Sequence, residues 1–198
     1  MPALRRINAM KMLITGLISL IVCCVFYLLW WRAGFYPGVT VSRVTGRVGA
    51  LLYITAVFGF LGVFLTVGGV NGIHAERQAL SWTAVLLGGV IVYAVLLAGS
   101  ALVLHRQVTT ELALITGWAA LMVMAAARTY AAGALTQGAF TAMLVIIAIA
   151  GVLSLIFYLA YYNVEPMKGF IFGMIPLITE AVSMLVFVVM LFVYGKGA

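Results

Sequence analysis

The sequence carries very little charge: it contains no aspartate, four glutamates and eleven basic residues, and only 8% of its residues are charged. Its hydrophobic content is 66%, whereas a soluble domain is about 45–50% apolar and about 25% charged. A soluble globule of 21.2 kDa needs a polar exterior, which so few charged side chains cannot provide. This scarcity excludes an ordinary soluble fold and predicts that hydrocarbon surrounds most of the protein.

Cysteine and histidine are also scarce, and neither is placed where a site would need it. Cys23 and Cys24 are the only cysteines, and they are adjacent within an apolar segment. Neighbouring residues on a helix point in different directions, so no intrachain disulfide framework is expected. We interpret both as small hydrophobic side chains, with acylation or redox chemistry as the alternative. The only histidines, His74 and His105, flank one predicted helix at opposite membrane surfaces, so we expect no metal site and no cofactor.

The net charge of +7 does not indicate a nucleic-acid-binding protein. The basic residues stand singly between apolar runs and form no stripe or aromatic-interleaved patch. Short basic connectors beside membrane helices are typical of contacts with anionic lipid headgroups. The candidates for such contacts are Arg32, Arg43 and Arg47. We therefore expect membrane lipids as partners, and other membrane subunits or further copies of the chain as additional ones.

Six apolar segments are long enough to cross a membrane. A bilayer core of about 30 Å needs about 20 predominantly apolar residues in a helix. None of the segments alternates polar and apolar residues as a barrel strand does. The sequence predicts an all-α, polytopic integral membrane helical bundle in which residues 1–198 form a single transmembrane domain. The predicted spans are 12–31, 48–70, 80–104, 112–135, 140–162 and 169–194.

An even number of spans places both termini on the same side of the membrane, called side A here. Basic residues divide equally between side A and the opposite side B, so the positive-inside rule gives no orientation. We favour a cytoplasmic N-terminus, because the first helix often dominates. Aromatic residues gather on side B, as is typical of a membrane interface. They are Trp30, Trp31, Phe35, Tyr36, Tyr158, Tyr161 and Tyr162.

Small residues are frequent in the second to fifth spans, whereas the sixth is bulkier. Small side chains let membrane helices approach closely and pack by van der Waals contact. We therefore expect the second to fifth spans to form the tightly packed centre. The first span and part of the sixth are expected to meet lipid or another subunit.

Glu180 lies near the middle of the last predicted span. A charged side chain there costs at least ~2.5–3.5 kcal/mol on insertion scales, which makes an intramembrane carboxyl a functional candidate. Pro176, Glu180 and Ser183 are spaced by four and three residues, so they share one helical face, which we expect to point into the bundle. Together with Thr179 and with Arg128 of the fourth span, these residues form the candidate intramembrane polar site. Glu180 is either a proton or cation site, or a neutral acid that donates one interhelical hydrogen bond; we favour the second.

Arg128, near the side-A end of the fourth span, is the second charge at membrane depth. One interpretation is an ion pair with Glu180 that holds two helices in register. Another is that the long side chain snorkels to the side-A headgroups. A third is a role in substrate binding. We favour snorkelling or structural pairing.

The sequence offers little catalytic chemistry, because it contains no nucleophile–base arrangement, phosphate-binding loop or metal-ligand cluster. An enzyme is therefore the least supported class. We interpret the chain as a non-catalytic multi-pass membrane protein that acts as an accessory or structural subunit of a larger membrane assembly. The alternative is a small solute or ion transporter or channel that uses Glu180, with Arg128, as a proton, cation or coupling site.

Overall fold

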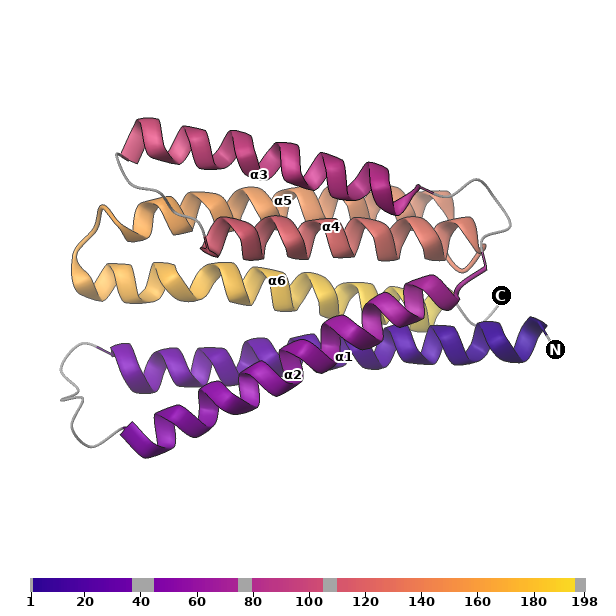
Figure 1. Ribbon diagram of the computed structural model, residues 1–198, viewed down its shortest axis with the longest axis horizontal. Coiled ribbons are helices and arrows are strands. Elements are labelled where there is room, and N and C mark those ends of the chain that lie inside the picture. Colours follow the sequence, from indigo (N-terminus) through magenta and orange to yellow (C-terminus); the bar gives the residue numbers. More distant parts are fainter. Residues whose placement is uncertain (1, 37–44, 75–79, 105–109, 195–198) are drawn as a thin grey trace.

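The computed structural model describes residues 2–36, 45–74, 80–104 and 110–194, and gives only the backbone for residues 2–6, 45–48, 103–104 and 110–111. Within these ranges the chain is helical and contains no strand. Each helix includes a segment long and apolar enough to cross a membrane, which confirms the predicted all-α bundle with six candidate spans. The helices are α1 (Pro2–Phe35), α2 (Thr45–Gly72), α3 (Trp82–Leu104), α4 (Thr110–Ala131), α5 (Gln137–Tyr161) and α6 (Pro166–Tyr194) (Figure 1).

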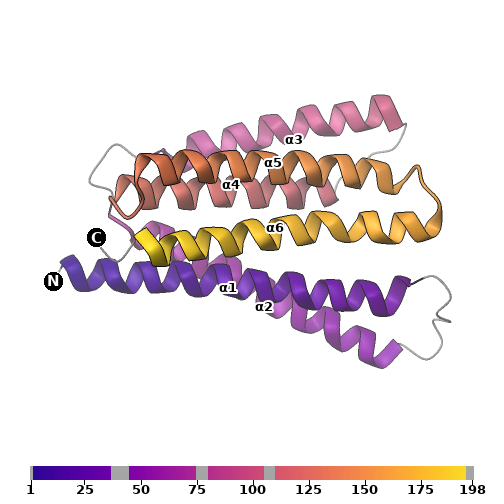
Figure 2. The same cartoon turned by 180° about the vertical axis from the view of Figure 1, so that it is seen from behind.

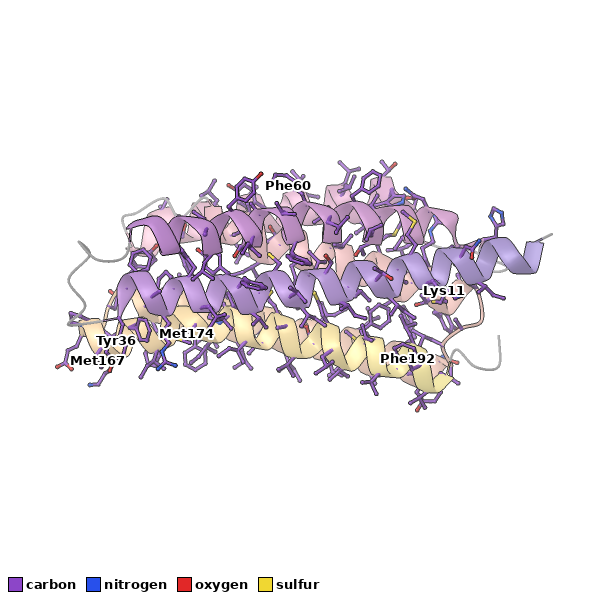
Figure 3. All side chains as sticks on the ribbon, turned by 90° about the horizontal axis from the view of Figure 1, so that it is seen from below. Lys11, Tyr36, Phe60, Met167, Met174 and Phe192 are labelled. Carbon is purple, nitrogen blue, oxygen red and sulfur yellow. The ribbon has the colours of Figure 1, made fainter. Side chains whose placement is uncertain are left out.

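The helices run up and down beside one another, so that α1 begins and α6 ends at the same end of the bundle (Figures 1 and 2). We call this the A end and the opposite one the B end. Lys11 lies towards the A end, whereas Tyr36 and Met167 lie at the B end (Figure 3). Helix α6 packs between α1 and α5, α4 packs against α5 and α3, and α2 crosses α1 obliquely. Helix α3 forms the outer edge, with α4 as its main neighbour.

Helices α1 and α2 form the most extensive helix contact, and glycine makes it possible. A Cβ atom on Gly16 would lie 2.5 Å from the amide nitrogen of Thr66. A Cβ atom on Gly69 would lie 2.5 Å from the amide nitrogen of Leu13. Cβ atoms essentially never approach other atoms within 3.0 Å, so no larger residue fits at either position without moving a backbone. The pair thus follows the small-residue packing of membrane helices.

The contact positions of this pair recur in steps of three or four residues, which keeps them on one face of each helix. The facing pairs are Ala9 with Gly72, Leu13 with Gly69, Gly16 with Thr66, Leu20 with Gly62 and Cys23 with Gly59. The two helices are antiparallel, because residue numbers increase along α1 while the numbers of their partners on α2 decrease.

The expectation that the second to fifth spans form the tight centre is wrong. Helix α3 is the least buried of the six, whereas α4 and α6 are the most buried. The first span packs along α2 and α6 instead of facing only lipid or another subunit. The physical reason is that close packing depends on which helix the glycines of a span face. The glycines of α2 from Gly59 to Gly72 contact α1, whereas Gly88 and Gly99 of α3 have no atom within 4 Å of the position of a Cβ.

The turn between α4 and α5 corrects the predicted span of residues 112–135. Helix α4 ends at Ala131, and Gly133 follows in the left-handed region at φ 77°. The amide of Gly133 donates to the carbonyl of Tyr130, a pattern typical of a helix C-terminus. Thr136 then caps α5 by accepting a hydrogen bond of 3.2 Å from the amide of Ala139. The new helix therefore starts three residues before the predicted fifth span, which was set at residue 140.

Helix α1 is longer than its predicted span. The span was bounded by the apolar residues, whereas the helix continues as long as its residues favour helical structure. It begins at Pro2, ten residues before the predicted start at residue 12. Proline is favoured in the first turn of a helix, and the arginines and lysine that follow are good helix formers. They extend the helix beyond its apolar part.

The hydrophobic core is built by residues of all six helices, with only Val85 from α3 among its buried members, and lies towards the A end. Leu13 and Leu17 of α1 are fully buried there, as are Val70 of α2 and Phe187 of α6. Helix α4 adds a methionine- and alanine-rich surface, and α5 adds Met143. Dispersion between these closely packed side chains holds the helices together, because lipid tails are as apolar as the side chains.

The aromatic residues of the B end join α1 to α5 and α6. The ring of Trp31 packs against Phe170 and Tyr161, with centroids 6.5 and 5.9 Å apart. The indole Nε1 of Trp31 donates a hydrogen bond of 3.2 Å to the backbone carbonyl of Phe170. The ring also fills the space beside Gly173, where a Cβ atom would lie 2.7 Å from it. The aromatic residues predicted for side B thus form a packed cluster between helices.

Candidate intramembrane polar site

The polar face of α6 points into the bundle, as the residue spacing predicted. Pro176, Glu180, Ser183 and Phe187 are all buried, with 8% of Glu180 and 2% of Ser183 exposed. The helix continues through Pro176, although proline removes one backbone donor there. This face is recognisable in the sequence because its neighbours around the helix are large, apolar and lipid-facing.

Hydroxyl groups on α6 are bound to the helix's own backbone. Thr179 Oγ1 donates to the carbonyls of Ile175 and Pro176, at 3.1 and 2.8 Å. Ser183 Oγ donates to the carbonyl of Glu180 at 2.7 Å. Each hydroxyl hydrogen is therefore already used, and only the oxygen lone pairs remain free to accept a hydrogen bond or to bind a cation.

Ser154 of α5 completes the polar layer. It is fully buried, and its Oγ lies 3.1 Å from Thr179 Oγ1. Because the Thr179 hydrogen points to the carbonyls of its own helix, Ser154 is the donor of this bond. Sequence reasoning missed Ser154, although a signal was present. It lies four residues after Ala150 and four before Tyr158, on the buried face of α5.

The carboxyl group of Glu180 is buried beside α1. The Cys24 thiol, which is 8% exposed, lies close enough to this carboxyl to interact with it electrostatically. Among the residues that the structure describes, none forms a hydrogen bond or ion pair with the Glu180 side chain. The interhelical hydrogen bond that we expected Glu180 to donate is therefore not formed. The bond between α5 and α6 in this layer belongs to Ser154 and Thr179.

Arg128 does not reach Glu180. Helix α4 packs mainly against α3 and α5, and α6 packs mainly against α5 and α1, so α5 separates the two residues. Arg128 lies in the last turn of α4, partly buried, and its Nε atom is buried without a hydrogen-bond partner in the described chain. Of the two structural interpretations of Arg128, the ion pair with Glu180 is wrong.

The predicted headgroup contacts are resolved only in part. Arg32 is exposed in the last turn of α1 at the B end, the position that a headgroup contact requires. Arg47 lies in the first turn of α2, where only the backbone is described. Arg43 lies outside the described residues.

The chemistry available at this site is limited to one carboxyl group, one neighbouring thiol and the acceptor lone pairs of three hydroxyls. No group of three or more histidine, cysteine or acidic side chains that could hold a metal occurs in the described part of the chain. A single carboxyl can bind and release a proton or pair with one monovalent cation.

Comparison of the chain with protein-family models, with curated proteins and with solved structures finds no match in any of the three.

Proposed function

We propose that this protein is a non-catalytic, multi-pass membrane subunit that supports a larger membrane assembly. The observation that carries the proposal is the outer face of α3. Gly88 and Gly99 are eleven residues apart, which places them in nearly the same direction on a helix. Neither has a neighbouring atom within 4 Å of the position of a Cβ. Val92 and Val95 lie between them on the same stripe and are 51% and 66% exposed.

The spacing of this stripe matches the spacing that α1 and α2 use to pack together. In both cases the stripe positions recur in steps of three and four residues; on α3 the small residues of the stripe are Gly88 and Gly99, with Val92 and Val95 between them. Within the chain, α3 packs mainly against α4, and its Leu96 and Leu97 also belong to the cluster around Tyr158 of α5. The outer stripe thus has the form of a helix-packing surface and supports contact with a helix of another protein.

Large apolar residues on α2 support the same proposal. Tyr53, Phe60 and Phe64 are 71–81% exposed and follow one another on one face. Figure 3 shows Phe60 pointing away from the bundle. The interior, in contrast, offers few polar groups, and the hydroxyls of α6 and of Ser154 are bound to backbone carbonyls or to each other. Thr66 Oγ1 of α2 is buried without a hydrogen-bond partner in the described chain.

The test is the native mass of the protein extracted from its own membrane in a mild detergent, with identification of any polypeptide that co-purifies. We expect a particle that contains the 21.2 kDa chain and at least one other protein. Gly99→Leu places a side chain on the outer stripe, where open space accepts it, and should release that partner while the bundle stays folded.

The matched control is Gly151→Leu on α5, another glycine with open space around it. It should keep the partner. A wild-type chain that purifies free of any other protein would contradict the proposal, as would a Gly99→Leu variant that retains the partner as well as Gly151→Leu does.

A second candidate function is the transport of protons or monovalent cations, and one observation favours it. The buried carboxyl of Glu180 receives no hydrogen bond from the described chain, whereas buried polar groups are normally satisfied. A proton or cation would provide the missing partner. Flux that depends on Glu180 would distinguish this function from a subunit role.

A further inference from the structure

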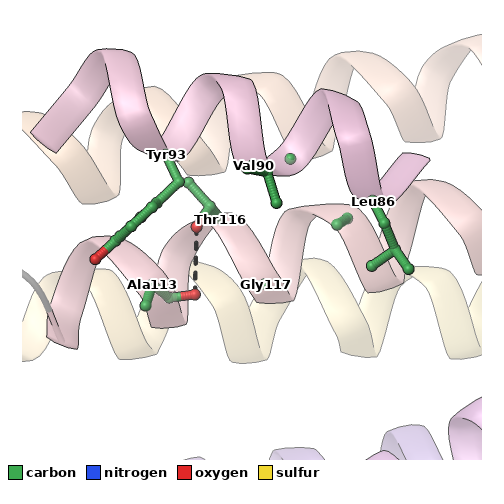
Figure 4. A pocket seen from close by; sticks show the side chains of 8 residues that line it. Leu86, Val90, Tyr93, Ala113, Thr116 and Gly117 are labelled. Carbon is green, nitrogen blue, oxygen red and sulfur yellow. Dashed lines mark hydrogen bonds between the residues drawn. The ribbon is translucent and has the colours of Figure 1, made fainter. Parts of the chain in front are cut away.

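A pocket of about 190 Å³ lies between α3 and α4, on the side of the bundle away from α1 and α2 (Figure 4). Its floor is made of small residues, which is why the two helices leave a space between them. Leu86, Val90 and Gly117 at its rim are exposed, so the pocket opens towards the surrounding bilayer. The lining residues are Leu86, Gly89, Val90, Tyr93, Ala113, Thr116, Gly117 and Ala120.

The floor of this pocket is apolar in effect. The hydroxyl of Thr116 donates to the carbonyls of Leu112 and Ala113, at 2.6 and 3.3 Å, so its hydrogen is satisfied within α4. Figure 4 shows the bond to Ala113. Glycine and alanine expose no polar side-chain atom. The pocket therefore suits a hydrocarbon chain better than a polar solute.

Arg128 lies beyond the A end of the same pocket. It is eleven residues after Gly117, so the two residues point in directions that differ by only about 20° around α4. Its guanidinium forms no ion pair within the described chain, and its Nε is buried without a partner. A positive charge held at this depth requires an anion, and no described residue supplies it.

We propose that the groove between α3 and α4 binds one anionic phospholipid of the A-end leaflet, with its phosphate on Arg128 and one acyl chain in the pocket. At a rise of 1.5 Å per residue, Arg128 and Gly117 are roughly 16 Å apart along α4. Half of the hydrocarbon core of a bilayer is about 15 Å, which is the depth of one leaflet. An acyl chain whose phosphate sits at Arg128 thus ends at the pocket.

Charge complementarity selects an anionic lipid over a zwitterionic one. The guanidinium matches phosphate oxygens in charge-assisted, bidentate hydrogen bonds. In a zwitterionic lipid the headgroup cation offsets much of that attraction. This lipid site is independent of the proposed assembly, because it uses the α4 side of α3 and not the outer stripe.

The test is native mass spectrometry of the purified protein in detergent, titrated with phosphatidylglycerol or phosphatidylcholine of identical acyl chains. We expect one tightly held phosphatidylglycerol on the wild type and on Arg128→Lys, which keeps the charge. Arg128→Gln should weaken phosphatidylglycerol binding about fivefold, the factor expected for one basic residue at an anionic headgroup, and leave phosphatidylcholine binding unchanged.

The pocket is tested separately by Gly117→Leu, which adds a side chain to the pocket lining at a position where a Cβ atom would meet nothing within 4 Å. This variant should lose affinity for both lipids, whereas Gly151→Leu, at an equally open site outside the pocket, should bind both as the wild type does. Thermal unfolding confirms that each variant is folded. Unchanged phosphatidylglycerol binding in Arg128→Gln overturns the proposal, and so does equal binding by Gly117→Leu and Gly151→Leu.

Discussion

Replacing Gly69 with alanine should separate α1 from α2. The new Cβ would lie 2.5 Å from the amide nitrogen and 2.7 Å from the Cα of Leu13, both of which are backbone atoms that no rotamer change can move. Ordinary van der Waals contact begins at 3.4 Å, so the helices must move apart by about 0.9 Å. A gap of that size removes roughly a quarter to a half of the van der Waals attraction of each contact between the two helices. We expect the free energy of unfolding to fall by about 2–3 kcal/mol, the upper part of the range for overpacked cores.

The assay is reversible unfolding in mixed detergent micelles with increasing dodecyl sulfate, followed by circular dichroism. The matched control is Gly49→Ala in the same helix, where a Cβ atom meets nothing within 4 Å. This control should be neutral or slightly stabilising, because alanine is the better helix former. A Gly69→Ala protein as stable as Gly49→Ala would refute the close packing of α1 on α2.

Three further changes test other parts of the bundle by the same unfolding assay. A double-mutant cycle of Ser154→Ala and Thr179→Val should give a coupling energy of about 0.6 kcal/mol, as is usual for hydrogen bonds between membrane helices; additive effects would contradict the bond. Trp31→Phe keeps the ring stacking but removes the donor to the Phe170 carbonyl, and should cost about 0.5–1.5 kcal/mol, whereas no loss would mean that this bond is not formed. Gly133→Ala forces alanine into the left-handed region and should cost about 1–2 kcal/mol, and a neutral result would argue against the turn.

The sequence was sufficient to predict the number and type of the helices. Every segment that crosses the hydrocarbon core must be a helix of about 20 apolar residues. Such segments can be recognised from their composition alone. The inward face of α6 was predictable for a related reason. Pro176, Glu180 and Ser183 are the residues that lipid would disfavour, and their spacing places them on one stripe.

The arrangement of the helices was not predictable in the same way. Helices α2 and α3 both carry glycine pairs among equally apolar neighbours, so no polarity difference marks which pair packs inside the chain. Only the fold decides that Gly69 meets Leu13 while Gly88 faces outwards. The proposed pairing of Arg128 with Glu180 was wrong for the same reason. The sequence gives the depth of each residue in the membrane from its position along the helix, but it does not say which helices are neighbours.

Ser154 shows a third limit of sequence reasoning. One hydroxyl in an apolar span is common and often bonds to its own helix, so the four-residue spacing from Ala150 and to Tyr158 was only a weak signal for Ser154. Its role appears only when Thr179 of α6 lies 3.1 Å away.

The central claim, that this bundle is a subunit and not a transporter, is tested most directly by ion flux through the purified protein. Proteoliposomes that contain a pH-sensitive dye would receive a potassium diffusion potential, and proton entry would be compared among the wild type, Glu180→Gln, Glu180→Asp and protein-free vesicles. Parallel vesicles with a sodium-sensitive dye would cover monovalent cations. The account predicts the same background flux in all four preparations. Flux in the wild type that Glu180→Gln abolishes and Glu180→Asp partly keeps would contradict it, because an amide cannot carry the proton or the charge that a carboxyl can.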